Sequence, residues 1–244
     1  MHHGGSKSEI VERLQKEILS LEGFKEPSSH HCAVGLGSLE SVFPNGIFPT
    51  GVVHEFMSHS PEETAATGGF VAGLLGRLIP QGGMCLWIGT KRTLYPAGLR
   101  IFGIDPDRII FIDLVHERDV LWTVEEALKC EALTVVVGEL KEISFMQSRR
   151  LQLAVEESGV TGLMHCYQPD KIGNTTSVVR WKISPLASVL EAGLPGVGHP
   201  CWKVELLKVR NGRPGSWQLL WRDGQFGQMD KVERTQEGTL SYTG

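Results

Sequence analysis

The chain has 244 residues, a length that suits one globular domain, and 41% of its residues are hydrophobic while 21% are charged. The 24 basic and 28 acidic side chains leave a net charge of −4, which excludes a global basic field for nucleic acid. The five cysteines are odd in number and form no CxxC pair, which argues against a disulfide framework and a zinc ribbon.

No apolar run approaches the roughly 20 residues of a membrane-spanning helix, and the first residues lack the apolar core of a signal peptide. We therefore expect a cytoplasmic protein with reduced thiols and no membrane partner. The donor atoms of residues 30–32 (His-His-Cys) lie in a polar stretch without a second ligand pair, so we expect no metal site.

Residues 6–23 have the pattern of an isolated amphipathic helix, because apolar side chains recur every three or four residues. A polar linker follows. An apolar stripe beyond a linker has to be buried on its own core or on another protein. The residues that we expect to mediate self-association or a partner contact are Ile10, Leu14 and Ile18.

Short apolar segments then alternate with amphipathic ones. The predicted strands are residues 52–56, 84–88, 109–112, 133–137 and 160–165. The predicted helices are residues 62–79, 94–102, 117–130 and 143–157. This alternation predicts an α/β fold with a mainly parallel sheet and helices on both faces.

The pattern changes after residue 176. Residues 177–184, 202–210 and 216–221 read as strands without helices between them, which predicts a C-terminal antiparallel extension of the sheet. We assign residues 1–27 to the N-terminal helix and linker, residues 28–223 to one domain, and residues 224–244 to a polar, disordered tail.

Three segments carry a resemblance to the RecA-like ATPase core. Residues 36–56 (LGSLESVFPNGIFPTGVVHEF) resemble the passage that leads into its first strand, with tight turns at Pro44-Asn45-Gly46 and Pro49-Thr50-Gly51. Residues 85–96 resemble its second strand and loop, and residues 133–139 resemble its Walker B strand. Over residues 8–221 the chain is similar to the ImuA family, the RecA-like accessory proteins of damage-induced (SOS) mutagenesis in bacteria.

The resemblance implies an adaptor in error-prone translesion synthesis that links a RecA recombinase to an inactive Y-family polymerase-like protein. The residues that handle ATP are missing. A phosphate loop needs glycines and a lysine between strand and helix, whereas residues 57–66 have neither and place Glu62 and Glu63 in the first helical turn. Lys91 stands where the family has a catalytic carboxylate, and Val137 is followed by Gly138 and Glu139 instead of an Asp. We expect no catalytic residues, no cofactor and no ATP hydrolysis.

Two other functions stay open. One is an active DNA-dependent ATPase with an unconventional phosphate site that uses Lys91 or Arg92 with Glu139. The other is a cell-division inhibitor, because such proteins share this degenerate fold.

Basic residues gather near the C-terminal strands, with tryptophans between them. The candidates for binding DNA weakly, or an acidic partner, are Arg180, Lys182, Lys208, Arg210 and Arg213. Strand alternation predicts that Lys208 and Arg210 share a face with Leu206. The competing interpretation is a solvated hairpin face with core tryptophans.

Overall fold

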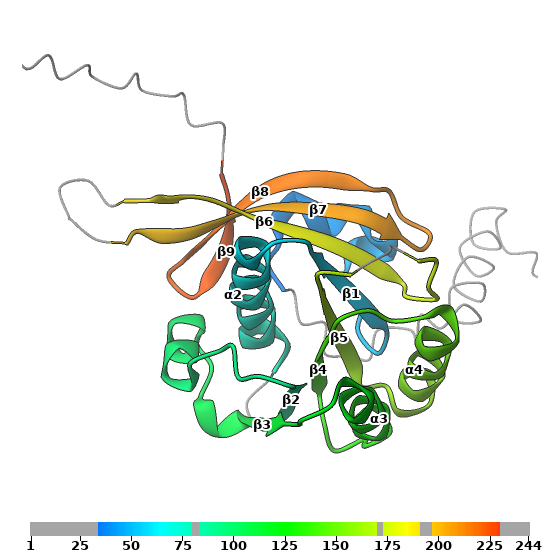
Figure 1. Cartoon of the computed structure of the whole chain (residues 1–244). Coiled ribbons are helices and arrows are strands. Elements are labelled where there is room, and N and C mark those ends of the chain that lie inside the picture. Colours follow the sequence, from blue (N-terminus) through cyan, green and yellow to red (C-terminus); the bar gives the residue numbers. More distant parts are fainter. Residues whose placement is uncertain (1–33, 80–82, 170–172, 191–196, 230–244) are drawn as a thin grey trace, which may run out of the picture.

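The computed structural model describes residues 34–79, 83–169, 173–190 and 197–229 (Figure 1). The predicted N-terminal helix, with Ile10, Leu14 and Ile18, lies outside the described residues. Within the described ranges, no helix combines the length and the apolar character that crossing a bilayer requires.

A nine-stranded sheet runs through the described part of the chain. Its strands are β1 (Val53–Ser58), β2 (Cys85–Gly89), β3 (Ile109–Asp113), β4 (Val135–Leu140), β5 (Thr161–Tyr167), β6 (Val179–Val189), β7 (His199–Val209), β8 (Gly215–Arg222) and β9 (Gln225–Gln228). They lie in the order β3-β2-β4-β5-β1-β6-β7-β8-β9. The pairs from β3 to β6 are parallel, and the pairs from β6 to β9 are antiparallel. The predicted mainly parallel sheet with an antiparallel extension is therefore confirmed.

Helices cover both faces of the parallel part (Figure 1). They are α2 (Pro61–Leu78) on one face and α3 (Glu117–Leu128) with α4 (Phe145–Ser158) on the other. Four short 3-10 segments complete the described elements: η1 (Gly37–Val42), η2 (Pro44–Gly46), η3 (Pro96–Phe102) and η4 (Pro106–Arg108). The segment predicted as a helix at 94–102 is thus a 3-10 turn, because it begins at Pro96 and ends at the left-handed Gly103.

Trp181 of β6 is the centre of the core on the α2 face. The ring is fully buried and stacks on Phe56, with ring centroids 5.6 Å apart. Its indole N–H donates to His54 Nδ1 at 3.2 Å, so His54 Nε2 carries the proton that it donates to the Pro49 carbonyl at 2.8 Å. Burial lowers the pKa of His54 to about 4, which keeps the imidazole neutral at pH 7. This chain of contacts ties the predicted turn at residues 49–51 to the antiparallel extension.

The tail predicted as disordered begins with structure instead. Strand β9 lies inside residues 224–244 and pairs with β8 through Leu219 to Arg222. Asp223 and Gly224 have positive φ and make the tight turn that joins the two strands. Phe226 is 7% exposed and packs against Phe70 and Trp221. One buried aromatic side chain therefore holds the strand, so the boundary predicted at residue 223 was wrong.

We predict that Phe226→Ala lowers the free energy of unfolding by about 3–5 kcal/mol, because it leaves a cavity beside Phe70 and Trp221. Phe145→Ala is the matched control, since Phe145 is 55% exposed and its loss should change stability by less than about 0.5 kcal/mol. Urea denaturation followed by tryptophan fluorescence measures both. Equal stability of the two variants would show that β9 does not contribute to the core.

Candidate functional site

The connection from β1 to α2 is short, and side chains cap it. Only His59 and Ser60 join the two elements. The Ser60 hydroxyl accepts a hydrogen bond from the Glu63 backbone N–H at 3.2 Å, and Glu63 Oε2 accepts one from the His59 backbone N–H at 2.8 Å. The first turn of the helix therefore satisfies its own donors, which a bound anion would otherwise need.

The Glu63 carboxylate is held from a second side by β6. Its Oε1 lies 3.2 Å from Lys182 Nζ and accepts a hydrogen bond from the Ser184 hydroxyl at 3.3 Å. Burial raises the pKa of Glu63, but the His59 N–H and the Lys182 ammonium outweigh burial and lower it. A negative charge is thus held at the helix N-terminus, where it repels a phosphate group.

Beside the N-terminus of α2 lies a pocket of about 490 Å³. It opens at the carboxyl ends of β2, β4 and β5 and is closed on one side by α2. The lining residues are Pro61, Thr64, Ala65, Gly68, Thr90, Lys91, Thr93, Leu94, Glu139, His165, Tyr167 and Gln168. The volume lies within the ~300–1,000 Å³ range of small-ligand sites, which makes this pocket the candidate site.

Glu139 of β4 lies at the floor of the pocket and is 5% exposed. The Thr93 hydroxyl donates to its Oε1 at 2.7 Å, and burial raises the pKa of the carboxyl. The preceding residue, Gly138, faces the other way, because a Cβ there would lie 2.7 Å from Val124 of α3. The alternation of the strand therefore turns position 139, and not position 138, toward the pocket.

A second polar chain runs behind the pocket. His165 Nε2 lies 3.0 Å from the Ser58 hydroxyl, which lies 2.9 Å from the Thr67 hydroxyl. Burial lowers the pKa of His165 to about 4, so its ring is neutral at pH 7. Because Ser58 and Thr67 are fully buried, their hydroxyls hold strand and helix together and do not face a substrate.

The structure separates the two cations considered for an unconventional phosphate site. Lys91 is exposed and lines the pocket that contains Glu139. Arg92 is not part of the lining: its guanidinium pairs with Asp113 at 2.7 Å and lies over the Phe111 ring, 5.1 Å from the centroid.

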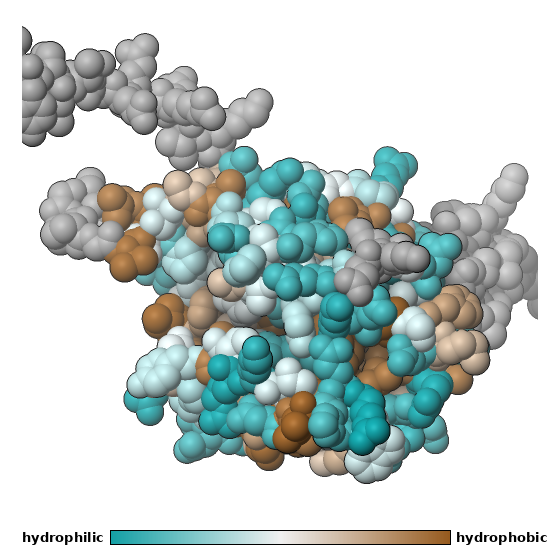
Figure 2. Space-filling model, in the orientation of Figure 1, coloured by the Kyte–Doolittle hydropathy of each residue, from teal (hydrophilic) through white to brown (hydrophobic). Residues whose placement is uncertain are grey.

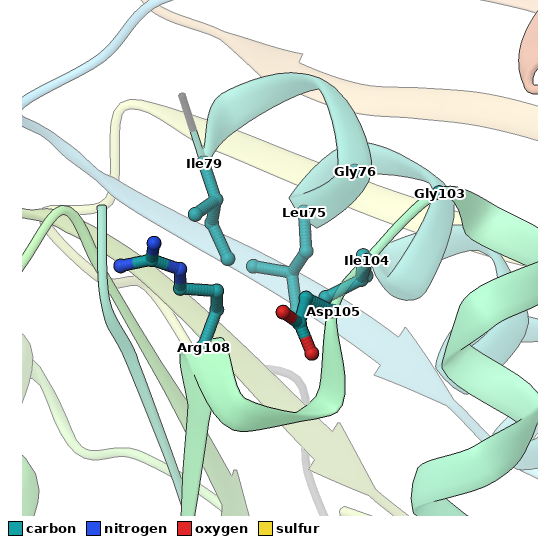
Figure 3. Close-up of a pocket in the computed structure, with 7 residues that line it drawn as sticks. All are labelled: Leu75, Gly76, Ile79, Gly103, Ile104, Asp105 and Arg108. Carbon is teal, nitrogen blue, oxygen red and sulfur yellow. The ribbon is translucent and has the colours of Figure 1, made fainter. Parts of the chain in front are cut away.

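Another pocket, of about 280 Å³, lies near the other end of the sheet, where Arg108 precedes β3 (Figure 3). Leu75, Ile79 and Ile104 contribute apolar side chains, while Asp105 and Arg108 bring the charges. Among the described residues of its lining, the charged side chains are not buried, so this pocket is the weaker candidate for a ligand site.

The basic candidates of β6 turn inward. Arg180 forms a nearly buried ion pair with Glu55 of β1 at 2.9 Å, and the two side chains are 11% and 2% exposed. The same guanidinium donates to the Thr175 hydroxyl at 2.8 Å and to the Gly173 carbonyl at 3.0 Å. With Lys182 bound to Glu63, both basic residues of β6 have partners inside the chain.

Lys208 of β7 and Arg210, which follows the strand, are also engaged. Lys208 Nζ donates to the Thr175 carbonyl and Arg210 to the Thr176 carbonyl, each at 2.8 Å. Burial lowers the pKa of Lys208. Arg213 lies exposed in the turn before β8. The five candidates therefore do not form one exposed cationic face.

A β-bulge separates Leu206 from Lys208 and Arg210. Trp181 pairs with Leu206 while the preceding Arg180 pairs with Lys208, so Leu207 is the extra residue. Leu206 is buried on the tryptophan face, and Lys208 with Arg210 lies on the opposite one, where Arg180 lies too. The prediction that Leu206 shares their face was wrong, because alternation does not continue through a bulge.

The tryptophans near these strands belong to the core. Trp202 and Trp221 are 3% and 2% exposed, and the Trp221 indole donates to the Ile101 carbonyl at 3.0 Å. Their rings are therefore not available to stack on nucleic-acid bases.

No protein-family model matches the chain. It is similar to the protein ImuA of Caulobacter vibrioides, in strains NA1000 and CB 15, with 31% identity over 205 residues in each. The alignment covers 79% of this chain and 84% of each relative. The chain belongs to the ImuA family.

Sequence reasoning missed three residues of this region. The sequence could have pointed to Glu55, because a carboxylate inside a strand that is predicted to be buried needs a cationic partner. His165 and Thr93 left no such signal, since their roles depend on which strands and loops lie side by side. Glu139 was found, and the structure explains how it faces the pocket from one position beyond the expected one.

We predict that Arg180→Ala lowers the free energy of unfolding by about 3–5 kcal/mol, because it leaves Glu55 buried without a counter-charge. Arg213→Ala is the control: Arg213 is exposed, so its loss should change stability by no more than about 0.5 kcal/mol. The double variant Glu55→Met/Arg180→Met should be more stable than Arg180→Ala, because both charges are removed together. Chemical denaturation measures all three, and a double variant as unstable as Arg180→Ala would contradict this account.

Proposed function

We propose that this ImuA-family protein is a non-catalytic adaptor in damage-induced, error-prone translesion synthesis. The observation that carries the proposal is membership of the ImuA family across 79% of the chain. The partners proposed are a RecA recombinase and an inactive Y-family polymerase-like protein, both taken from the family resemblance.

The helix N-terminus supports the non-catalytic part of the proposal. In a phosphate-binding loop the backbone donors and a lysine receive the triphosphate. Here Ser60 and Glu63 occupy that position, and Lys182 reaches Glu63 instead of a ligand. Hydrolysis would have to proceed without the parts on which phosphoryl transfer depends.

Surface composition supports a protein partner more than DNA. Arg180, Lys182 and Lys208 are bound to groups of their own chain. Exposed apolar side chains gather instead on α4, where Phe145, Met146 and Leu153 are 55%, 71% and 48% exposed. Figure 2 shows this apolar surface at the right of the molecule, over α4. Exposed apolar groups of this size are typical of protein contacts.

We predict that the full chain, tagged and recovered from cells after DNA damage, retains the recombinase and the polymerase-like protein. Capture of the division tubulin in their place would favour a cell-division inhibitor. The matched variant lacks residues 1–26, which removes the stripe of Ile10, Leu14 and Ile18. It should stay folded by circular dichroism and lose self-association or one of the two partners, whereas an unfolded variant would assign the stripe to its own core.

We also predict no magnesium-dependent ATP hydrolysis above background, with or without single-stranded DNA, because Glu63 excludes a phosphate from the N-terminus of α2. Phosphate release at steady state is the measurement. Turnover that disappears in Glu139→Ala would overturn the prediction and favour the DNA-dependent ATPase.

A further inference from the structure

We infer that the pocket above Glu139 binds an organic cation on a flexible aliphatic stem, such as a guanidinium or a primary amine. The inference does not depend on the proposed function. It starts from a comparison of three glutamates with low exposure in the same sheet region, which differ in whether a cation accompanies them.

Two of these glutamates bring their own counter-charge. Glu55 pairs with Arg180 at 2.9 Å, and Glu63 pairs with Lys182 at 3.2 Å. Glu139 is different: among the described residues, the neutral Thr93 hydroxyl donates to it at 2.7 Å, and no cationic side chain forms an ion pair with it. The ionised form of a carboxyl group that is 5% exposed carries a desolvation cost, which a cation entering the pocket would offset.

The protein makes room for this carboxyl group. A Cβ on Gly89 would lie 2.8 Å from Glu139 Oε2, so any larger residue at the end of β2 would displace the side chain. Glu139 is therefore accommodated by a neighbouring glycine and directed at a cavity of about 490 Å³.

The walls suit an aliphatic stem. The face of α2 that closes the pocket presents Thr64, Ala65 and Gly68, while Leu94 and Pro61 add apolar surface. A Cβ on Gly68 would meet only the end of Leu94, at 3.9 Å, so space remains along the helix. Methylene groups pack on such a wall while the charged end reaches the floor, as arginine and lysine stems do elsewhere.

The charges around the pocket favour a cation over an anion. In the part of the lining that the structure describes, Lys91 is the one lysine or arginine, and it is exposed. Tyr167 donates its hydroxyl proton to Glu117 at 2.9 Å, which places a second carboxylate near the opening. A planar guanidinium matches the two oxygens of a carboxylate better than an ammonium does.

The test uses the full chain and two small probes of the same shape, N-acetyl-arginine methylamide and its uncharged isostere N-acetyl-citrulline methylamide. Binding is followed by titration with protein NMR. We expect the arginine probe to bind in the millimolar range and the citrulline probe to bind at least about 10-fold more weakly. Equal binding of both, or binding of neither, would overturn the inference.

Variants locate the site. Glu139→Gln should weaken binding of the arginine probe at least about 10-fold, and Lys91→Ala should strengthen it by removing a competing charge. Glu62→Gln is the matched control. Glu62 is an exposed carboxylate in the first turn of α2, close to the pocket, but it does not line the pocket. Should Glu139→Gln fail to fold, Gly68→Leu fills the cavity from the helix side and should abolish binding as well. Full binding by a folded Glu139→Gln or Gly68→Leu protein would show that the cation binds elsewhere.

Two sources could supply this cation, a free amine and an arginine side chain of another protein. The amine agmatine and the peptide Gly-Gly-Arg-Gly-Gly separate them in the same titration. Tighter binding of agmatine points to a small metabolite, tighter binding of the peptide points to a protein side chain, and either result requires Glu139.

Discussion

The carboxylate of Glu63 is the interaction on which this end of the molecule depends. It closes the first turn of α2 through the His59 N–H, and it joins that turn to β6 through Lys182 and Ser184. One side chain thereby satisfies the helix N-terminus and links the parallel part of the sheet to the antiparallel extension. A phosphate group at this helix N-terminus could take over the first function but not the second.

The need to pair a buried carboxylate also explains where the basic residues of the antiparallel extension lie. A parallel strand such as β1 is buried on both faces, so a glutamate at position 55 requires a partner from the neighbouring strand. Arg180 supplies it, and the polar segment before β6 is held in turn by Arg180, Lys208 and Arg210 through Gly173, Thr175 and Thr176. A cluster that suggests a nucleic-acid surface in the sequence is thus largely an internal clamp between β1, β6 and β7.

The contrast between a basic cluster in the sequence and internal contacts in the structure shows what sequence patterns could predict. Apolar alternation identified every strand of the parallel sheet, and the lack of helices after residue 176 identified the antiparallel extension, because both depend on local periodicity. The bulge at Leu207 and the strand around Phe226 were not predictable in that way. A bulge depends on the partner strand, and a four-residue strand in a polar tail depends on one aromatic side chain reaching a cavity between Phe70 and Trp221. In the candidate site, Glu139 could be found by resemblance to a Walker B strand, while Thr93 and His165 join it only through the crossing of chain segments.

A RecA-like core usually combines a phosphate position at the end of its first strand with open space beside it, and the two are distinct here. The Glu63 carboxylate lies at the N-terminus of α2, while the space between α2 and the ends of β4 and β5 remains open at about 490 Å³. Gly68 leaves space along α2, since a Cβ there would meet only Leu94, and Gly89 leaves room for the Glu139 carboxyl group. The small residues at both positions preserve the cavity and the carboxyl group together. Among the described residues, the buried carboxyl group of Glu139 has no cationic partner and faces a cavity that Gly68 leaves open, which is the basis for inferring a cation from outside the chain.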